Sequence, residues 1–323
     1  MRSEVIQRSL SFIAAGLLGA LLAAPSADAA VIYDDGYSIE AVYESIGRPS
    51  GLAFGPGRSI NYSSFYPTSL SGLYRIAPSG TQHQTSSVAG ASVVRDQSGT
   101  MYLSGRNDRQ GVLKVRPNGE VSSLVSNGTF YDLSLSSDGS RLIASTLTAI
   151  WEIDTATGTL TQLLARPTDI VLSLAISDSG EIFFTSYSGL YQLTADGPDL
   201  VVSSPKQDGV IVNAFFDLAL DPVGGMWMVT AYGAGDGLLY HFDALSGLNL
   251  IADFDAGEAF IAFDQRSGYL VVGGQLAGDG SNPPPASNPI TLLRTPFSVP
   301  EPGALMSLVI GLTAIAFTRR RRH

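Results

Sequence analysis

The chain has 323 residues, of which 45% are hydrophobic and 15% are charged, and it contains no cysteine. Disulfides, thiolate metal centres and cysteine nucleophiles are therefore excluded, so the fold must rely on its own hydrophobic core. Residues 30–301 carry 13 basic and 27 acidic side chains, a net charge of −14 that would repel a phosphate backbone and excludes nucleic-acid binding.

The first 29 residues have the organisation of a secretory signal peptide. Arg2 and Arg8 supply a basic start, residues 10–24 are apolar, and Ala27 and Ala29 form the A-x-A pattern that precedes a cleavage site. The alternative is an uncleaved membrane helix, but the apolar run is short and leads directly into the small-residue pattern. We therefore predict export and cleavage before Ala30.

A short alternating segment follows, from Tyr37 to Glu44 (YSIEAVYE), with no obvious partner of its own. The last repeat of the chain, described next, lacks its fourth strand. Because a ring of sheets must remove its open edges, we predict that residues 37–44 pair beside residues 290–294 and complete the last unit. The alternative is a disordered N-terminal arm.

The body consists of a repeated unit of four short apolar strands joined by tight turns, seen clearly in DLSLSSDG, RLIAST, AIWEIDTATG and TLTQLL. The first turn of each unit ends in a glycine; these are Gly57, Gly99, Gly139, Gly180, Gly224 and Gly268. The spacings of 42, 40, 41, 44 and 44 residues are typical of a β-propeller. No amphipathic helical pattern occurs between Ala30 and Thr295, so we predict an all-β, six-bladed propeller over residues 30–296.

The body resembles the six-bladed propellers of the NHL-repeat, gluconolactonase-like and streptogramin-lyase-like groups. The resemblance rests on the apolar strand, the Asp/Gly turn and strands such as GLYRI (residues 72–76). It implies a fold and not a chemistry. The gluconolactonase-like group holds a divalent metal with Glu, Asn and Asp residues, whereas streptogramin-lyase-like activity depends on histidines near the channel. This chain has only His83, His241 and His323, and the sequence shows no clustered pair.

A polar residue stands at the start of each predicted innermost strand. In the first five units it lies seven positions before the turn glycine, and in the last unit it lies ten positions before it, to allow for a longer turn. These residues are Ser50, Ser92, Asp132, Ser173, Asp217 and Glu258. Carboxylate oxygens suit a hard cation such as Ca²⁺, so Asp132, Asp217 and Glu258 form a candidate metal site at the tunnel mouth. The alternative, which we favour, is that these residues face a hydrated channel without a metal.

The loops on the same face differ most between units and are the expected place for binding. They cover residues 61–71, 105–110, 231–237 and 275–289. Aromatic, Arg and Asn side chains in them would suit stacking on sugar rings and hydrogen bonds to sugar hydroxyls; these are Tyr62, Phe65, Tyr66, Arg106, Asn107, Arg109 and Tyr232. The alternative is a set of variable surface loops without a ligand.

The end of the chain, residues 297–323, has three features in a fixed order. Pro300-Glu301-Pro302 keeps the backbone extended, residues 304–318 are uncharged and apolar, and four arginines follow, Arg319, Arg320, Arg321 and Arg322. A helix formed by this apolar run would span about 23 Å. That is short for a permanent membrane anchor, which is the alternative interpretation of this segment. The combination resembles the PEP-CTERM sorting signal of Gram-negative bacteria, which implies processing by the membrane enzyme exosortase.

Together these patterns favour a surface-sorted propeller without catalytic activity, which binds an extracellular polysaccharide or a surface protein or serves as a matrix component. A metal-dependent lactonase or lyase-like enzyme is the alternative. The expected route is export, a transient inner-membrane intermediate, and then the cell surface or extracellular matrix. We expect no catalytic residues and no cofactor other than Ca²⁺ in the alternative case.

Overall fold

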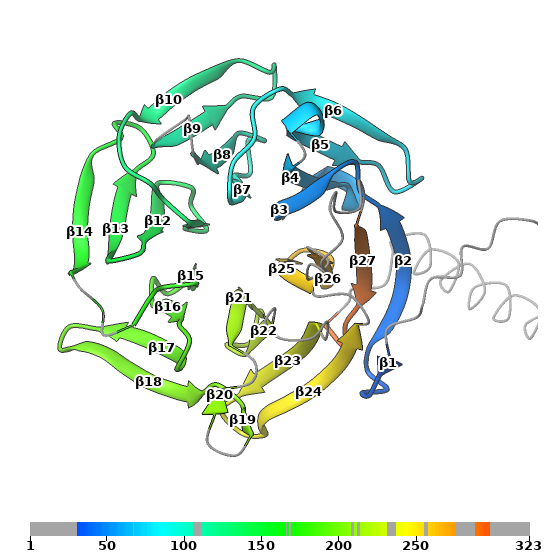
Figure 1. Ribbon diagram of the computed structural model, residues 1–323, viewed down its shortest axis with the longest axis vertical. Coiled ribbons are helices and arrows are strands. Elements are labelled where there is room, and N and C mark those ends of the chain that lie inside the picture. Colours follow the sequence, from blue (N-terminus) through cyan, green and yellow to red (C-terminus); the bar gives the residue numbers. More distant parts are fainter. Residues whose placement is uncertain are drawn as a thin grey trace, which may run out of the picture. The chain divides into compact units, whose positions relative to one another are not determined.

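The computed structural model describes residues 31–66, 68–105, 111–165, 167, 169–207, 210–211, 214–230, 237–254, 258–274 and 288–297. They form six antiparallel blades arranged in a ring around a central channel (Figure 1). The predicted signal peptide, the Pro-Glu-Pro triplet and the Arg cluster lie outside the described residues. Among the residues given above, the helical segments are too short to cross a bilayer.

The first three blades each contain four strands in chain order. Blade 1 consists of β3 (Arg48–Phe54), β4 (Ile60–Tyr66), β5 (Gly72–Ile76) and β6 (Gln82–Ser86). Blade 2 consists of β7 (Val93–Arg95), β8 (Met101–Ser104), β9 (Val112–Val115) and β10 (Val121–Val125). Blade 3 consists of β11 (Asp132–Leu135), β12 (Arg141–Thr146), β13 (Ala149–Asp154) and β14 (Leu160–Ala165). Blade 1 also carries two 3₁₀ turns, η1 (Pro56–Arg58) and η2 (Thr68–Leu70).

The other three blades follow the same plan with two additions. Blade 4 consists of β15 (Ser173–Ile176), β16 (Ile182–Thr185), β17 (Gly189–Thr194) and β18 (Gly197–Ser203). A small hairpin of β19 (Lys206–Gln207) and β20 (Val210–Ile211) leads to blade 5, which consists of β21 (Phe215–Leu220), β22 (Met226–Thr230), β23 (Gly237–Asp243) and β24 (Gly247–Phe254). The strand β1 (Val31–Ile32) adds to the outer edge of β24.

Blade 6 closes the ring with strands from both parts of the chain. It contains β25 (Glu258–Asp264), β26 (Tyr269–Gly274) and β27 (Pro289–Arg294), and its outer strand is β2 (Ser38–Glu44). The two outer strands are antiparallel and pair from Ser38 opposite Arg294 to Glu44 opposite Pro289. The predicted closure by the N-terminal segment is therefore confirmed, and the alternative of a loose arm is excluded.

The hydrophobic core lies between neighbouring blades rather than in one centre. Between blades 6 and 1, Leu52 and Tyr62 pack with Tyr269 and Ile290, and Tyr43 of β2 covers the outer side of this cluster. Full burial of one such side chain contributes about 1.5–3 kcal/mol. Closing the ring thus buries apolar surface as well as pairing the strand edges.

The turn glycines of the repeat act as predicted. All six have a positive φ, for example 73° at Gly139 and 95° at Gly99. A residue with a Cβ is disfavoured in this region of backbone space, which explains why glycine marks each unit in the sequence. The described helical segments are the two short 3₁₀ turns of blade 1, as expected for an all-β chain.

Candidate binding site in the central channel

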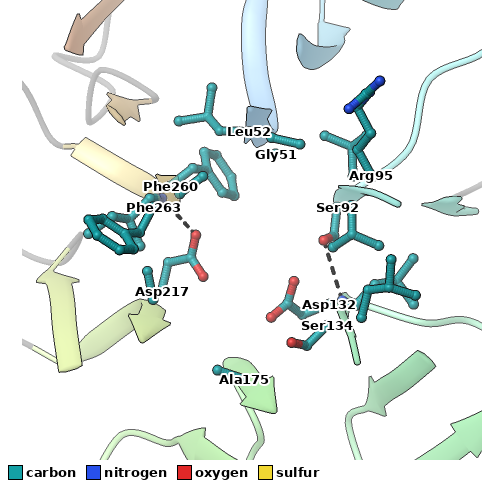
Figure 2. Close-up of a pocket in the computed structure, with 18 of the residues that line it drawn as sticks. Gly51, Leu52, Ser92, Arg95, Asp132, Ser134, Ala175, Asp217, Phe260 and Phe263 are labelled. Carbon is teal, nitrogen blue, oxygen red and sulfur yellow. Dashed lines mark hydrogen bonds between the residues drawn. The ribbon is translucent and has the colours of Figure 1, made fainter. Parts of the chain in front are cut away.

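The inner strands of all six blades line a central cavity of about 1020 Å³. Two carboxyl groups reach this cavity from the blades on either side of blade 4, Asp132 on blade 3 and Asp217 on blade 5 (Figure 2). Phe260 and Phe263 of blade 6 also line the cavity, as does Ser134, two residues after Asp132. The cavity therefore combines an acidic pair with aromatic and small polar side chains.

Ser173 joins the two acidic side chains across blade 4. Its Oγ lies 2.8 Å from Oδ2 of Asp132 and 2.6 Å from Oδ1 of Asp217. A serine hydroxyl carries a single hydrogen, so it can donate to only one of two carboxylates. Both contacts are hydrogen bonds when one carboxyl group is protonated and donates to the Ser173 oxygen. The geometry is therefore that of two acids which hold a proton between them.

The electrostatics of the pair agree with this geometry. Removal from water, and to a lesser extent the nearby charge of Asp132, together raise the pKa of Asp217 to about 8. Burial also raises the pKa of Asp132. Although both residues keep some exposed surface toward the channel, protein surrounds their carboxyl groups. At neutral pH the pair thus retains a proton.

The same polar positions connect neighbouring blades. Asp132 Oδ2 accepts a 2.9 Å bond from the Leu174 amide of blade 4, and Asp217 Oδ2 accepts a 2.8 Å bond from the Ile261 amide of blade 6. The equivalent serines do likewise: Ser50 donates to the Gly90 carbonyl at 2.6 Å and Ser92 accepts from the Leu133 amide at 3.3 Å. The predicted row of polar residues is present in blades 1–5, and each member bonds to the next blade.

The sixth member of this row is Phe260 and not Glu258. Ile261 donates to Asp217 in the way that Leu174, the residue after Ser173, donates to Asp132. The residue that corresponds to Ser173 is therefore Phe260, which lines the cavity. The prediction placed this member ten residues before Gly268 to allow for a longer first turn. That turn is only one residue longer, with the Gly268 amide bonded to the Asp264 carbonyl four positions back, so the position lies eight residues before Gly268, at Phe260. Glu258 begins β25 opposite Gly274.

The described carboxyl groups of the predicted metal site, Asp132 and Asp217, are already occupied by protein hydrogen bonds. Both oxygens of Asp217 accept protein hydrogen bonds, and a cation would have to displace those donors and the proton of the pair. Among the described residues, no three His, Asp or Glu side chains are grouped so that they could hold a metal ion. The side chain of Glu258 lies outside the described part of the molecule, so the predicted trio as a whole stays a prediction.

The predicted loop-face residues have mixed outcomes. Tyr62 is not in a loop: it lies in β4, is 0% exposed, stacks on Tyr74 and bonds to the Ile46 amide and Gln82. The backbones of Phe65 and Tyr66 also belong to β4. The assignment of residues 61–71 to one loop is therefore wrong for its first six residues. Arg106, Asn107, Arg109 and Tyr232 lie outside the described residues.

The described rim on this face is apolar and aromatic. Leu147, Ile170 and Tyr187 line the mouth of the cavity while keeping 44%, 37% and 38% of their surface exposed. Tyr131, one residue before Asp132, lines the same mouth. None of these residues was predicted from the sequence as part of the site. Two of them could have been predicted from the repeat: Tyr131 directly precedes the inner strand β11, and Tyr187 follows β16, the second strand of blade 4. Both positions lie at the rim.

Neither described histidine lines the channel. His83 is exposed on β6, the outer strand of blade 1. His241 bonds through Nε2 to Asp221 at 2.9 Å and packs against Trp227 on blade 5. The two described histidines therefore lie apart, on the outer strand of blade 1 and within blade 5.

Comparison with known proteins supports the fold. No protein-family model and no curated sequence matches the chain. Among solved structures, a protein described as a candidate gluconolactonase has 13% identity and a TM-score of 0.59, over 83% of this chain and 98% of that one. Regucalcin from Agrobacterium tumefaciens, described as calcium-binding, has 15% identity and a TM-score of 0.57, over 84% and 96%. Streptogramin B lyase has 11% identity and a TM-score of 0.52, over 79% and 98%.

These likenesses define the class of protein. The chain has a six-bladed β-propeller fold that resembles the gluconolactonase and regucalcin folds. At such low identity the likeness extends to the architecture and not to the activity.

Proposed function

We propose that this protein is an exported, non-catalytic propeller that binds a neutral, amphipathic ligand such as a polysaccharide segment at the loop-face mouth of its channel. The observation that carries the proposal is the rim of Leu147, Ile170, Tyr131 and Tyr187, partly exposed apolar and aromatic groups around a cavity that contains serine and aspartate side chains. Sugar rings present apolar faces and hydroxyl edges, which match such a rim and the hydroxyl and carboxyl groups below it.

The chemistry of the channel favours binding over catalysis. Asp132 and Asp217 are committed to bonds between blades, and Ser173 lies between two acids rather than beside a base. Neither described histidine lies in the channel to serve as a general base. The site can accept and donate hydrogen bonds to a ligand, and no hydroxyl group among its described residues lies beside a histidine that could activate it as a nucleophile.

A glycan array tests this proposal. We expect the wild-type propeller to bind a subset of the glycans, and the double substitution of Tyr131→Ala and Tyr187→Ala to weaken that binding at least tenfold, as expected when stacking worth about 1.5 kcal/mol is lost. Tyr33→Ala is the matched control, because Tyr33 is 54% exposed and does not line the cavity. Equal binding by the rim variant and the control would contradict the proposal.

The alternative is a metal-dependent lactonase or lyase-like enzyme. It is favoured by the acidic pair within the channel and by the names of the structural neighbours, one of which is described as calcium-binding. A panel of lactones assayed with Ca²⁺, Mn²⁺ and Zn²⁺ separates the two. Turnover that a chelator abolishes would establish the enzyme and overturn the binding proposal.

We further propose that delivery follows the two terminal signals of the sequence. Export would end with cleavage before Ala30, and exosortase would process the tail near Pro300-Glu301-Pro302 before transfer to the cell surface or matrix. The support is the sequence pattern alone. Mass spectrometry of both termini of the mature protein tests this, and a mature form that retains Arg319–Arg322 would contradict it.

A further inference from the structure

A second, smaller cavity of about 270 Å³ lies between blades 1 and 2 on the opposite face, where the first turns of the blades are found. Arg75 of β5, Arg95 of β7 and Arg116 just beyond β9 all line it. No Asp or Glu is among the residues that line this cleft. Three arginines around one small cleft are unexpected in a body with a net charge of −14.

The positive charge of this cleft is only partly neutralised. Arg116 pairs with Glu120 at 2.7 Å, and both side chains are about half exposed. The side chains of Arg75 and Arg95 make no hydrogen bond or ion pair with any residue that the structure describes. The charge of Asp96 acts on Arg95, but Oδ1 of Asp96 already accepts bonds from Ser98 and Thr100.

The guanidinium group of Arg95 lies close to the adjoining turn. Its Nη2 lies 2.8 Å from the point where a side chain on Gly99 would begin, and Pro117 lies 3.3 Å from the same point. Burial lowers the pKa of Arg95, and the charges of Arg75 and Arg266 act in the same direction while Asp96 opposes them. The arginines thus repel one another and gain from any anion placed between them.

A buried amide supplies independent support for a ligand. Asn61 of β4 lines the cleft and is only 4% exposed, and its Nδ2 has no hydrogen-bond partner. A buried donor without a partner is unfavourable, because it has lost its hydrogen bonds to water. The cleft therefore offers unused donors and positive charge but no carboxylate, which is the pattern that an anion satisfies.

We propose that this cleft binds an oxyanion group of the phosphate or sulfate type. The guanidinium groups of Arg75 and Arg95 would contact its oxygens, and Asn61 would donate to one of them. The volume suits a single tetrahedral group with a few further atoms. The acidic remainder of the propeller does not prevent this, because salt screens charges beyond about 8 Å at physiological ionic strength.

The experiment is a titration of the ¹⁵N-labelled propeller with inorganic phosphate and with inorganic sulfate, at constant ionic strength. We expect saturable shifts of amides around Gly99 and Asn61. Arg95→Gln and, separately, Arg75→Gln should weaken binding at least tenfold. Arg141→Gln, which breaks an exposed pair with Glu152 on blade 3, should change it less than twofold. Sulfate stabilises proteins generally by exclusion from their surface, so a rise in melting temperature that is equal in all variants would not count as binding.

Two results would overturn the proposal: shifts that do not saturate, or equal affinity in wild type and both cleft variants. Should Arg95→Gln fail to fold, Arg75→Gln and the direct titration of wild type still decide the question. Titration with sulfated dextran, with unsulfated dextran as its control, shows whether the natural ligand is a free ion or a group on a polymer. Binding of both sulfate and sulfated dextran indicates a sulfate ester on a polymer. Binding of inorganic sulfate alone indicates a free anion. The rim variant Tyr131→Ala and Tyr187→Ala should keep this binding unchanged.

Discussion

Trp227 donates its indole N–H to the hydroxyl group of Tyr37 across a distance of 3.0 Å, although the two residues are 190 positions apart in sequence. Both are buried, with exposed fractions of 0% and 6%. Tyr37 directly precedes β2, the closing strand of blade 6, whereas Trp227 belongs to β22 of blade 5. This bond thus ties the N-terminal segment to a second blade at the point where the ring closes.

Removal of the Tyr37 hydroxyl should therefore weaken closure. Tyr37→Phe leaves the buried Trp227 N–H without its partner, which should cost about 1–3 kcal/mol of unfolding free energy. Urea denaturation measures the loss. Tyr33→Phe is the control, because Tyr33 is exposed and should change stability by less than about 0.5 kcal/mol. Equal losses in the two variants would contradict a special role for the Tyr37–Trp227 bond.

Deletion of the closing strand should have a larger effect. A chain that starts at Ser45 would expose the edge of β27 and the core around Tyr269 and Ile290. An uncovered strand edge promotes association, so we expect aggregation or loss of cooperative unfolding by light scattering and circular dichroism. A chain that starts at Tyr37 lacks only β1 on the outside of blade 5 and should stay monomeric and folded. A monomeric Ser45 variant of unchanged stability would contradict closure by β2.

Ser173 should matter more than a neighbouring channel serine. Ser173→Ala removes the hydroxyl group that lies between the carboxyl groups of Asp132 and Asp217. Because two hydrogen bonds involving charged groups are lost, the free energy of unfolding should fall by about 2–4 kcal/mol. Ser134→Ala removes a single 3.1 Å bond from the Ile176 amide and should cost about 1 kcal/mol. Thermal unfolding compares the two, and a smaller loss for Ser173→Ala would contradict the bridging role.

Stability should fall as the pH rises from about 4 to 8. Because the folded pKa of Asp217 is about 8 and its unfolded pKa about 3.9, the folded state holds a proton that the unfolded state releases in this window. The contribution is complete below pH 4 and is lost as the pH rises through about 8. Asp132→Asn retains a side-chain oxygen that can bond to Leu174 and Ser173, but it removes the negative charge beside Asp217. The substitution should therefore reduce the fall in stability between pH 4 and pH 8. Urea titrations at pH 5 and pH 8 measure it, and parallel slopes in wild type and variant would contradict the account.

The repeat could be predicted from sequence because its signals are local. Turn glycines with positive φ and alternating strands recur in every unit, and a missing strand in one unit has a visible counterpart in residues 37–44. Tyr62 was misplaced because Asn61, Ser63 and Ser64 of β4 are polar yet buried, so the strand reads as a polar loop. These serines lie against a neighbouring blade; Ser63, for example, bonds to Gly90.

The site was less predictable because its members meet only in three dimensions. The polar position of each inner strand could be read from the repeat, but its bonds to the next blade could not. The sequence indicates that the first turn of blade 6 is longer but not by how much, so Glu258 was predicted in place of Phe260. The arginine cleft combines residues from two blades, and nothing in the spacing of Arg75 and Arg95 indicates that they share a cavity.

Asp132 and Asp217 hold a proton between them and link neighbouring blades in the channel. This can be examined by carbon-13 NMR of the aspartate carboxyl groups, recorded from pH 3 to pH 9 with and without Ca²⁺. We predict that one aspartate, assigned by Asp217→Asn, titrates near pH 8 and that Ca²⁺ leaves its resonance unchanged at neutral pH. If both carboxyl groups ionise below pH 5 and shift on addition of Ca²⁺, the channel is a metal centre and the account is wrong.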